Sequence, residues 1–421
     1  MINLVVLFLD VIFLAWFAFW VYQSQPIAYK PYFWPALSLK ILAGVAVGAL
    51  YFFHYGAGDT ISYWQDGVKI SAYAQSFPAD ALAFFWDESE AFDFVTTLQQ
   101  QGPRSLFFSK ICGLFALATG ANYWMMSAFA SVISFLGAWF LFRRMSEFFP
   151  SHQRVAAIAF LVFPSVVFWS SGLIKESVGL AALYFLVAVC LSMIYNRAPS
   201  LLEWVLTIVS LWMGWNLKYY WMGILIPVAI PMVLIGVAKR SRPAFARYDI
   251  LLWSGLFFVF LIVATSIHPN FYPSRFLEVI YQSNLEFTRL SDPPRIVQYF
   301  NLEPSLSSLM MNAPAAWIAG LFRPFAWEAY NLLSMVAGIE NLMLLVIVCV
   351  ALPSLGRLGS SPHRLPVLAT MVYVILLIGF LALSTPNFGT LSRYKIGAVP
   401  FLVFLCLSSN RTIGRWLGEK E

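Results

Sequence analysis

The sequence predicts an all-α protein that crosses a membrane many times. Of its 421 residues, 60% are hydrophobic and only 11% are charged, whereas about a quarter of residues are charged in soluble globular proteins. Apolar runs close to the length of a membrane span recur from one end of the chain to the other. In lipid, a helix satisfies every backbone polar group within itself. We therefore expect one transmembrane domain over residues 1–421.

The expected spans follow one another along the whole chain. The first apolar run has no basic residues before it and no small-residue cleavage site, so we expect a retained helix and not a signal peptide. The apolar segments lie at 2–22, 34–53, 121–142, 155–171, 177–195, 201–217, 219–238, 249–267, 329–352, 365–383 and 395–409.

The basic residues predict the orientation of these segments. They gather in short connections, namely Arg143, Arg144 and Arg154, Arg197, Lys239, Arg240, Arg242 and Arg247, Arg357 and Arg364, and finally Arg411, Arg415 and Lys420. Short loops rich in Lys and Arg stay in the cytoplasm. The two long connections differ, because 54–103 is acidic with Lys69 as its one base, and 268–308 mixes acids with bases. We expect both long connections outside.

Two further apolar stretches, 104–120 and 309–325, decide the span count. If both crossed the membrane, the basic connections would alternate between its two sides, against the charge rule. We therefore read both as interfacial or re-entrant segments. This leaves about eleven spans (range roughly 10–13), with the N-terminus outside and the C-terminus inside. The first extracytoplasmic loop then covers 54–120 with an interfacial helix, and the second covers 268–325 with a re-entrant segment.

Several classes of function are not indicated. Cys112, Cys190, Cys349 and Cys406 lie in apolar runs without paired spacing, which is typical of small buried hydrophobes. The chain has no phosphate-loop, dinucleotide-binding or H-E-x-x-H motif, so a nucleotide-driven reaction is not expected. The net charge of +6 follows topology and does not point to nucleic acid. No cofactor is predicted, and the involvement of a divalent metal stays open.

Polar clusters interrupt the apolar pattern, and the predicted topology places them all at extracytoplasmic helix ends. The clusters are "GDTISYW" (58–64), "WSSGLIKES" (169–177), "WNLKYYW" (215–221), "FRPFAWE" (322–328) and "LSRYKIG" (391–397). A charge at membrane depth costs at least a few kcal/mol, so it needs a partner or a wet cavity. Gathered on one face, these groups would suit a chamber for an anionic, membrane-borne substrate.

The first cluster offers a carboxylate at a fixed place. Gly56 and Gly58 flank Asp59 closely and favour a tight turn that aims the side chain. Tyr63 would share its face if the turn runs into a helix, and Asp66 is the nearest second acid. A helix cap or an ordinary loop acid is the alternative for Asp59.

The other clusters offer cations where the charge rule disfavours them. These candidates are Lys175, Lys218, Arg323, Arg393 and Lys395, with Glu176, Glu328 and Tyr394 beside them. Arg presents a planar fork of donors and Lys a compact charge, and both suit a phosphate or pyrophosphate. For Arg393 and Lys395, snorkelling to lipid headgroups is the alternative, and for Glu176 a first-turn or ion-pair role.

On these residues the chain resembles the GT-C class of integral-membrane glycosyltransferases. The resemblance rests on the acid of "GDTISYW", on "FPSVVFWSSGLIKES", and on "SRYKIGAVPFLVFL", which is similar to the R-Y-x-x-x-x-x-P helix starts of bacterial members. Two spans before a G-D-x-x-x-Y loop also resemble O-antigen and exopolysaccharide polymerases.

The resemblance implies transfer of a sugar from a polyprenyl phosphate or pyrophosphate carrier to a glycan, lipid or protein acceptor. It implies a bacterial inner-membrane protein whose active face is extracytoplasmic. Asp59 would then be the general base, and Arg393 and Lys395, with Lys175 and Arg323, would neutralise the phosphate. Two alternatives remain, namely a polymerase of lipid-linked glycans and a transporter or flippase of a lipid-linked or anionic solute. For the transporter, a buried pair of Asp10 and Lys40 is the feature to examine.

Overall fold

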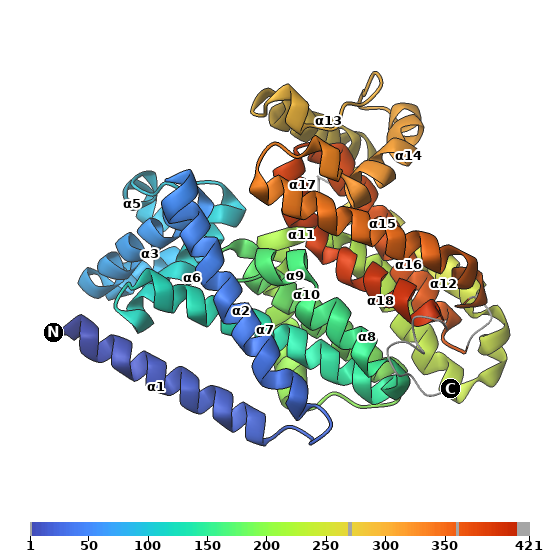
Figure 1. Ribbon diagram of the computed structural model, residues 1–421, viewed down its shortest axis with the longest axis horizontal. Helices are drawn as coiled ribbons and strands as arrows, with labels where there is room; N and C mark the ends of the chain where they lie inside the picture. Colours follow the sequence, from blue (N-terminus) through green and yellow to red (C-terminus); the bar gives the residue numbers. More distant parts are fainter. Residues whose placement is uncertain (1, 268–271, 359–361, 411–421) are drawn as a thin grey trace. The chain divides into compact units, whose positions relative to one another are not determined.

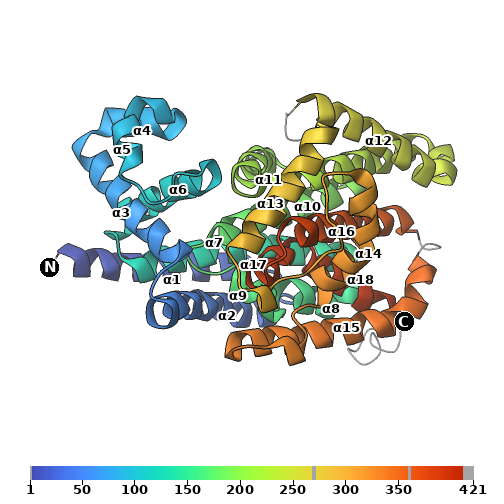
Figure 2. The same ribbon diagram turned by 90° about the horizontal axis from the view of Figure 1, so that it is seen from above.

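The computed structural model describes residues 2–267, 272–358 and 362–410, and all regular structure in these ranges is helical (Figures 1 and 2). The prediction of an all-α protein is thus confirmed for the described residues. The C-terminal bases Arg411, Arg415 and Lys420, and the start of the second predicted loop at 268–271, lie outside them.

The described residues form α-helices along most of the chain. These helices are α1 (Ile2–Gln23), α2 (Lys30–Ala49), α3 (Asp59–Ser76), α4 (Pro78–Trp86), α5 (Phe92–Thr96), α6 (Pro103–Thr119), α7 (Tyr123–Phe148), α8 (Gln153–Ala157), α9 (Pro164–Trp169), α10 (Lys175–Ile194), α11 (Leu201–Ser241), α12 (Asp249–Ile267), α13 (Pro273–Arg289), α14 (Leu306–Phe322), α15 (Leu332–Leu358), α16 (Arg364–Ser384), α17 (Phe388–Tyr394) and α18 (Val399–Ser409).

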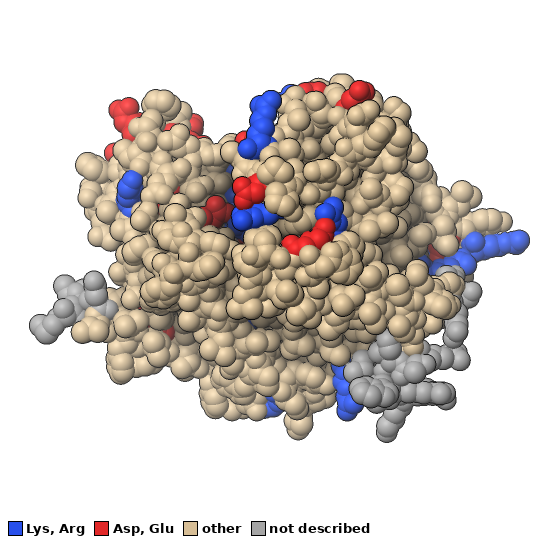
Figure 3. Space-filling model, turned by 45° about the horizontal axis from the view of Figure 1, so that its top comes forward, with Lys and Arg blue, Asp and Glu red and all other residues tan. Residues whose placement is uncertain are grey.

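Eight of the described helices are long and apolar enough to cross a membrane, or nine if the bent pair of α17 and α18 counts as one span. This supports a multi-pass membrane protein, and the face drawn in Figure 3 carries few charged side chains. The helices α6 and α14, which cover the predicted interfacial and re-entrant segments, are not among these candidates.

Two expected spans take a different form in the structure. The segment 155–171 is not one straight helix, because α8 runs into a π-helix (Ile158–Val162) and the chain then breaks at Phe163. Pro164 causes the break, since the residue before a proline is driven out of the helical conformation. Phe163 accordingly has φ −60° and ψ 123°. The segments 201–217 and 219–238 join into α11, which has non-helical angles at Lys218.

Contacts divide the chain into two compact units. Unit 1 comprises 1–143, 167–186 and 206–219, and unit 2 comprises 144–166, 187–205 and 220–421. The boundaries fall inside α7, α9, α10 and α11, and each unit contains candidate spans. The single domain expected over 1–421 stays a prediction.

In unit 1, the first long loop is a packed set of helices and not an extended connection. α3 lies against α6, where a Cβ on Gly67 would come within 2.9 Å of Cys112 atoms, so the two backbones approach closely. Ile70, Phe84, Leu98 and Leu106 form a small core beside this contact. The region 54–120 therefore holds α3, α4, α5 and α6, where one interfacial helix was expected.

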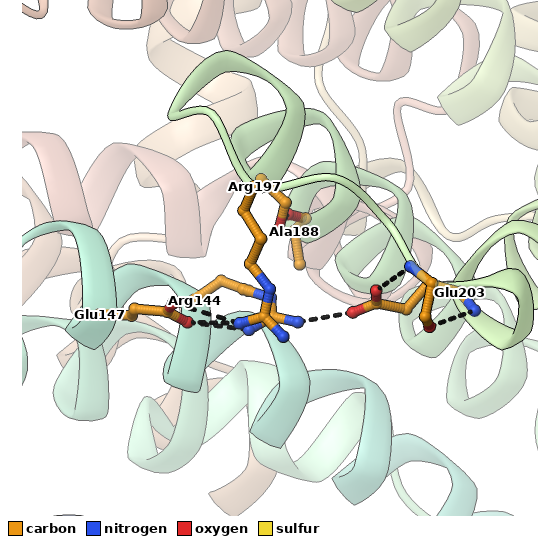
Figure 4. A network of polar contacts seen from close by, with 7 residues as sticks. Arg144, Glu147, Ala188, Arg197 and Glu203 are labelled. Carbon is orange, nitrogen blue, oxygen red and sulfur yellow. Dashed lines mark hydrogen bonds and ion pairs between the residues drawn. The ribbon is translucent and has the colours of Figure 1, made fainter.

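In unit 2, ion pairs join two of the basic connections (Figure 4). Arg144, only 2% exposed, contacts Glu147 at 2.8 Å and Glu203 at 2.5 Å, and Arg197 contacts the same Glu147 at 2.9 Å. Glu203 also forms a capping box with Ser200 at the start of α11. The end of α7 and the connection from α10 to α11 therefore lie together.

Further contacts bring the remaining described connections of unit 2 to one another. The Tyr195 hydroxyl lies 2.8 Å from Nδ1 of His363. Next to His363 in the chain, Arg364 shares the carboxylate of Asp249 with Lys239, each at 2.7 Å. Because these connections gather at one place, they can share one side of the membrane, as the charge rule requires.

Candidate functional site

Three helices of unit 1 each contribute two adjacent residues to a polar cluster, which we call the three-helix cluster. Its members are Arg104 and Ser105 of α6, Lys175 and Glu176 of α10, and Lys218 and Tyr219 of α11. Each pair contacts the other two, since Lys175 Nζ donates to Ser105 Oγ at 3.0 Å, Lys218 Nζ donates to Glu176 Oε1 at 2.6 Å, and Arg104 Cζ lies 5.1 Å from the Tyr219 ring centroid.

Local sequence signals place these side chains. α6 begins at Pro103, a residue suited to the first helical position because it lacks a backbone N–H. α10 begins after an irregular stretch in which Gly172 has φ +79°, a conformation that favours glycine. Lys218 has φ −143° and ψ 58°, so α11 breaks at the residue that carries the buried ammonium.

The cluster carries more positive than negative charge. Glu176 is fully buried and the Lys218 side chain is 3% exposed, so this ion pair is withdrawn from water. Lys175 is half-buried and Arg104 is exposed. With one acid and three bases, the cluster has a net charge of +2. Its charged side chains range from the exposed Arg104, through the half-buried Lys175, to the buried Lys218 and Glu176.

α3 contacts this cluster through Tyr63 and carries the predicted acid, Asp59, one turn earlier. The buried Tyr63 hydroxyl donates to Ser105 Oγ at 3.4 Å, and Lys175 Nζ lies 5.6 Å from the Tyr63 ring centroid. Asp59 is the first residue of α3 and half-buried, one helical turn before Tyr63, which is about 6 Å along the axis. Gly58, at φ +131°, fixes the entry of the chain, and a Cβ there would meet the Tyr51 ring at 2.6 Å.

Asp66 has a different position from Asp59. It is completely buried and accepts from the backbone N–H groups of Gln99 (2.8 Å) and Gln100 (3.0 Å) and from Ser109 Oγ (3.2 Å). These contacts engage both carboxylate oxygens. Asp66 therefore holds the segment before α6 against α3, and its part in substrate binding, as the second acid beside Asp59, stays a prediction.

A buried lysine supports the stretch that leads into α10. Lys40 of α2 is 2% exposed, and its ammonium donates to Ser134 Oγ (2.9 Å), to the Ser170 carbonyl (3.3 Å) and to Ser170 Oγ. The neighbouring Gly172 N–H donates to Ser131 Oγ at 2.9 Å. Asp10 and Lys40 do not form an ion pair in the described residues. The Lys40 ammonium instead donates to serine oxygens of α7 and of the stretch before α10.

The remaining predicted site residues belong to unit 2. Arg323 Nε donates to both oxygens of Glu328, at 3.0 and 3.1 Å, and Arg323 Cζ lies 4.7 Å from the Phe388 ring centroid. Burial raises the pKa of Glu328, but hydrogen bonds from Arg323 and from the Phe325 N–H outweigh it and leave the pKa below its ordinary value. This carboxylate is therefore ionised and bound to its arginine at neutral pH.

Arg393, Tyr394 and Lys395 lie at the bend between α17 and α18. Arg393 is 7% exposed, with its Cζ 6.0 Å from the Tyr394 ring centroid. Lys395, 2% exposed, donates to the Leu321 carbonyl at 2.9 Å and to Asn341 Oδ1 at 2.7 Å. Lys395 thus links the end of α14 to α15, and its predicted contact with phosphate stays a prediction.

The structure therefore groups the candidates by unit. Tyr63, Lys175, Glu176 and Lys218 come together, and Asp59 lies one turn before Tyr63 in α3. The sequence pattern did not single out Arg104 and Ser105 as candidates. The charge rule could have identified Arg104, because it is a base in a loop predicted to be outside, and the same reasoning selected Lys175.

Comparisons with known proteins identify no relative of this chain. No protein-family model, no curated protein and no solved structure matches the chain. Within the part of the chain that the structure describes, no three His, Cys, Asp or Glu side chains are grouped so as to hold a metal ion.

Proposed function

We propose that the protein transfers a sugar from a polyprenyl phosphate or pyrophosphate carrier to a glycan, lipid or protein acceptor, on the extracytoplasmic face of a bacterial inner membrane. The observation that carries the proposal is the three-helix cluster in contact with Tyr63 of α3, with Asp59 one turn before Tyr63. The buried and half-buried cations lie on α10 and α11, two helices apolar enough to span a membrane, and the carboxylate lies on α3, whose Tyr63 contacts Ser105 of the cluster. Such a set of groups suits a reaction that releases an anionic, lipid-linked leaving group.

Each group has a role in this reaction. Asp59 takes the proton of the acceptor hydroxyl while its oxygen attacks the anomeric carbon. The bond from that carbon to the phosphate oxygen breaks, and the carrier phosphate leaves with the electron pair. Lys175 neutralises the charge that builds on this oxygen, and the buried pair of Glu176 and Lys218 holds the start of α10 against the break in α11.

We also propose a GT-C-like arrangement with about eleven spans. The count follows if α17 and α18 form one span, the two arms of α11 cross separately, and the broken segment 153–169 crosses once. Support for the second step is the amount of helix in α11. Its 41 residues amount to about 60 Å of helix in total, twice the thickness of the hydrocarbon core, and the non-helical Lys218 separates the two arms.

The test is release of the carrier by the purified full chain. The protein in lipid nanodiscs is given undecaprenyl-phosphate-linked and undecaprenyl-pyrophosphate-linked hexoses with an acceptor extract, and the freed carrier is measured by mass spectrometry. We expect wild type to release the carrier and Asp59→Asn to lose at least about a hundredfold in rate. Asp80→Asn removes an exposed acid from the same loop and serves as the matched control.

The outcomes separate the candidate functions. A product ladder of repeated units would favour the polymerase, which uses the same donor chemistry. Equal rates for wild type and Asp59→Asn would remove the catalytic role of Asp59. The buried polar contacts of Lys40 are the feature that favours a transporter, and movement of an intact lipid-linked sugar across proteoliposomes, without release of the carrier, would put that function first.

A further inference from the structure

Arg104 has the properties of an anion-binding side chain. It is exposed at the first turn of α6, and in the described ranges 2–267, 272–358 and 362–410 it forms no ion pair with an acid. Its guanidinium lies over the Tyr219 ring at 5.1 Å. A ring contact of this kind fixes the guanidinium plane and leaves the N–H groups at its edge available.

The neighbours of Arg104 complete a set of donors for a tetrahedral anion. Ser105 is the next residue, and its hydroxyl oxygen already accepts from Lys175 and from Tyr63, so its own proton can be donated to a further acceptor. The Lys175 ammonium lies 3.0 Å from that hydroxyl oxygen. A guanidinium fork, an ammonium and a hydroxyl proton are therefore gathered at one place.

The distribution of charge favours an anion over a neutral ligand. The innermost base, Lys218, is matched by Glu176 at 2.6 Å, whereas Arg104 and Lys175 lie further out. A negatively charged ligand would balance Arg104, which forms no ion pair in the described ranges, and would leave the buried pair of Lys218 and Glu176 intact. A planar guanidinium fork next to a hydroxyl suits phosphate oxygens in particular.

We infer that Arg104 and Ser105, together with Lys175, bind the phosphate group of a polyprenyl-linked ligand at the first turn of α6. The inference rests on the proposed function for the identity of the lipid, and it assigns two residues that the sequence did not single out. The site recognises phosphate chemistry, which a lipid carrier or free phosphate can supply.

The test measures binding and not turnover. Radiolabelled undecaprenyl phosphate is titrated onto the purified full chain in neutral detergent, with undecaprenol, which lacks the phosphate, as the reference lipid. We expect Arg104→Gln to weaken undecaprenyl phosphate binding about tenfold, as for the loss of one charge-assisted contact. Arg104→Lys, which keeps the charge and loses the fork, should fall between Arg104→Gln and wild type.

Lys69→Gln is the matched control, because it removes an exposed base of the same loop whose ammonium bonds the Thr97 carbonyl. Its affinity should stay within twofold of wild type. Arg104 is exposed, so Arg104→Gln should unfold at the wild-type temperature. If inorganic phosphate displaces the lipid, the site accepts phosphate from both sources. If inorganic phosphate does not displace the lipid and Arg104→Gln still weakens binding, the site is specific for lipid-linked phosphate.

Two results would overturn the inference. One is equal affinity of Arg104→Gln and Lys69→Gln for undecaprenyl phosphate, and the other is equal affinity of wild type for undecaprenol and undecaprenyl phosphate. Failure of the proposed function has a different signature. If binding depends on Arg104 but no sugar-linked carrier is turned over, the phosphate site stands and the transferase proposal falls.

Discussion

At the scale of single residues, the pair of Glu176 and Lys218 is the most consequential contact in unit 1. Both side chains are almost completely buried, at 0% and 3% exposure, and their charges lie 2.6 Å apart. Removing one partner of a buried ion pair leaves the other charge without compensation. We expect Glu176→Gln to lower the free energy of unfolding by about 3–5 kcal/mol, measured by thermal or denaturant unfolding in detergent.

The double substitution Glu176→Gln/Lys218→Met is the control for this prediction. It removes both charges, and replacement of a buried ion pair by neutral side chains of similar volume is often close to neutral in stability. The double variant should therefore be more stable than Glu176→Gln alone. The single variant Lys218→Met completes the comparison. If the losses in free energy of unfolding of Glu176→Gln and Lys218→Met add up to that of the double variant, the pair does not act as a unit.

The contact between Arg323 and Glu328 predicts a dependence of stability on pH. The pKa of Glu328 in the folded chain is below the ordinary value of 4.5, so the stability it contributes is complete above that value. This contribution is lost as the pH falls through the lower, folded pKa. We expect Glu328→Gln to lower the unfolding temperature at neutral pH, and the gap from wild type to close progressively below pH 4.5.

A matched variant for this experiment is Glu303→Gln, which removes an exposed carboxylate of the same unit. It should leave the unfolding temperature close to wild type at both pH values. A gap between wild type and Glu328→Gln that is independent of pH would show that packing, and not ionisation, explains the effect of the substitution.

At the scale of helices, the close approach of α3 and α6 depends on Gly67. A Cβ at this position would come within 2.9 Å of the Cys112 backbone and Cβ, so one of the two helices must shift. Overpacking costs about 1–3 kcal/mol, whereas alanine gains about 1 kcal/mol over glycine within a helix. We expect Gly67→Ala to destabilise the protein overall, with a lower unfolding temperature.

Gly255 provides the control for the helix-propensity part of this argument. It lies inside α12, and a Cβ there would meet no atom within 4 Å. Gly255→Ala should therefore leave the unfolding temperature unchanged or raise it. If both alanine variants behave alike, the contact of α3 with α6 is looser than the distance at Gly67 implies.

Hydropathy predicted the helices well where an apolar run is uninterrupted and less well where one residue changes the backbone. It placed a junction between two apolar segments at 218, and the structure has non-helical angles at Lys218 within α11. It treated 155–171 as continuous, although Pro164 breaks the chain at Phe163. The Ser165 N–H at this break donates to Glu340 at 2.7 Å, a contact between residues far apart in sequence that hydropathy does not contain.

The same limit applies to the candidate site. The charge rule selected Lys175 and Lys218, because a base outside the cytoplasm needs an explanation. Their partners, Ser105 and Glu176, follow only from the packing of α6, α10 and α11. The sequence suggests a pair of Lys40 with Asp10, because both are charged residues in apolar runs. In the structure, neutral serine oxygens accept hydrogen bonds from the Lys40 ammonium.

At the scale of the whole molecule, the positions of charges along α10 bear on its orientation. The helix begins at Lys175 and ends at Ile194, and its 20 residues extend about 30 Å, the thickness of the hydrocarbon core. The basic connection with Arg197 follows its far end. From the charge rule we therefore expect Lys175 outside and Arg197 inside.

Single cysteines test this orientation directly. In a background without Cys112, Cys190, Cys349 and Cys406, a cysteine is placed at Ala57, just before Asp59, or at Ala198, just after Arg197. Both positions are exposed, whereas Thr60 is buried against Tyr123 and would not report on sidedness. With a membrane-impermeant thiol reagent, we expect Ala57→Cys to react in intact cells and Ala198→Cys only after permeabilisation.

The alternative results have distinct consequences. The opposite pattern would put Asp59 on the cytoplasmic side, where the proposed donor phosphate is not presented, and the transferase proposal would fall. Labelling of both sites in intact cells would mean that the chain crosses the membrane an even number of times between residues 57 and 198. The segments 104–120 and 155–171 would then decide the topology, because one of them would have to change its assignment.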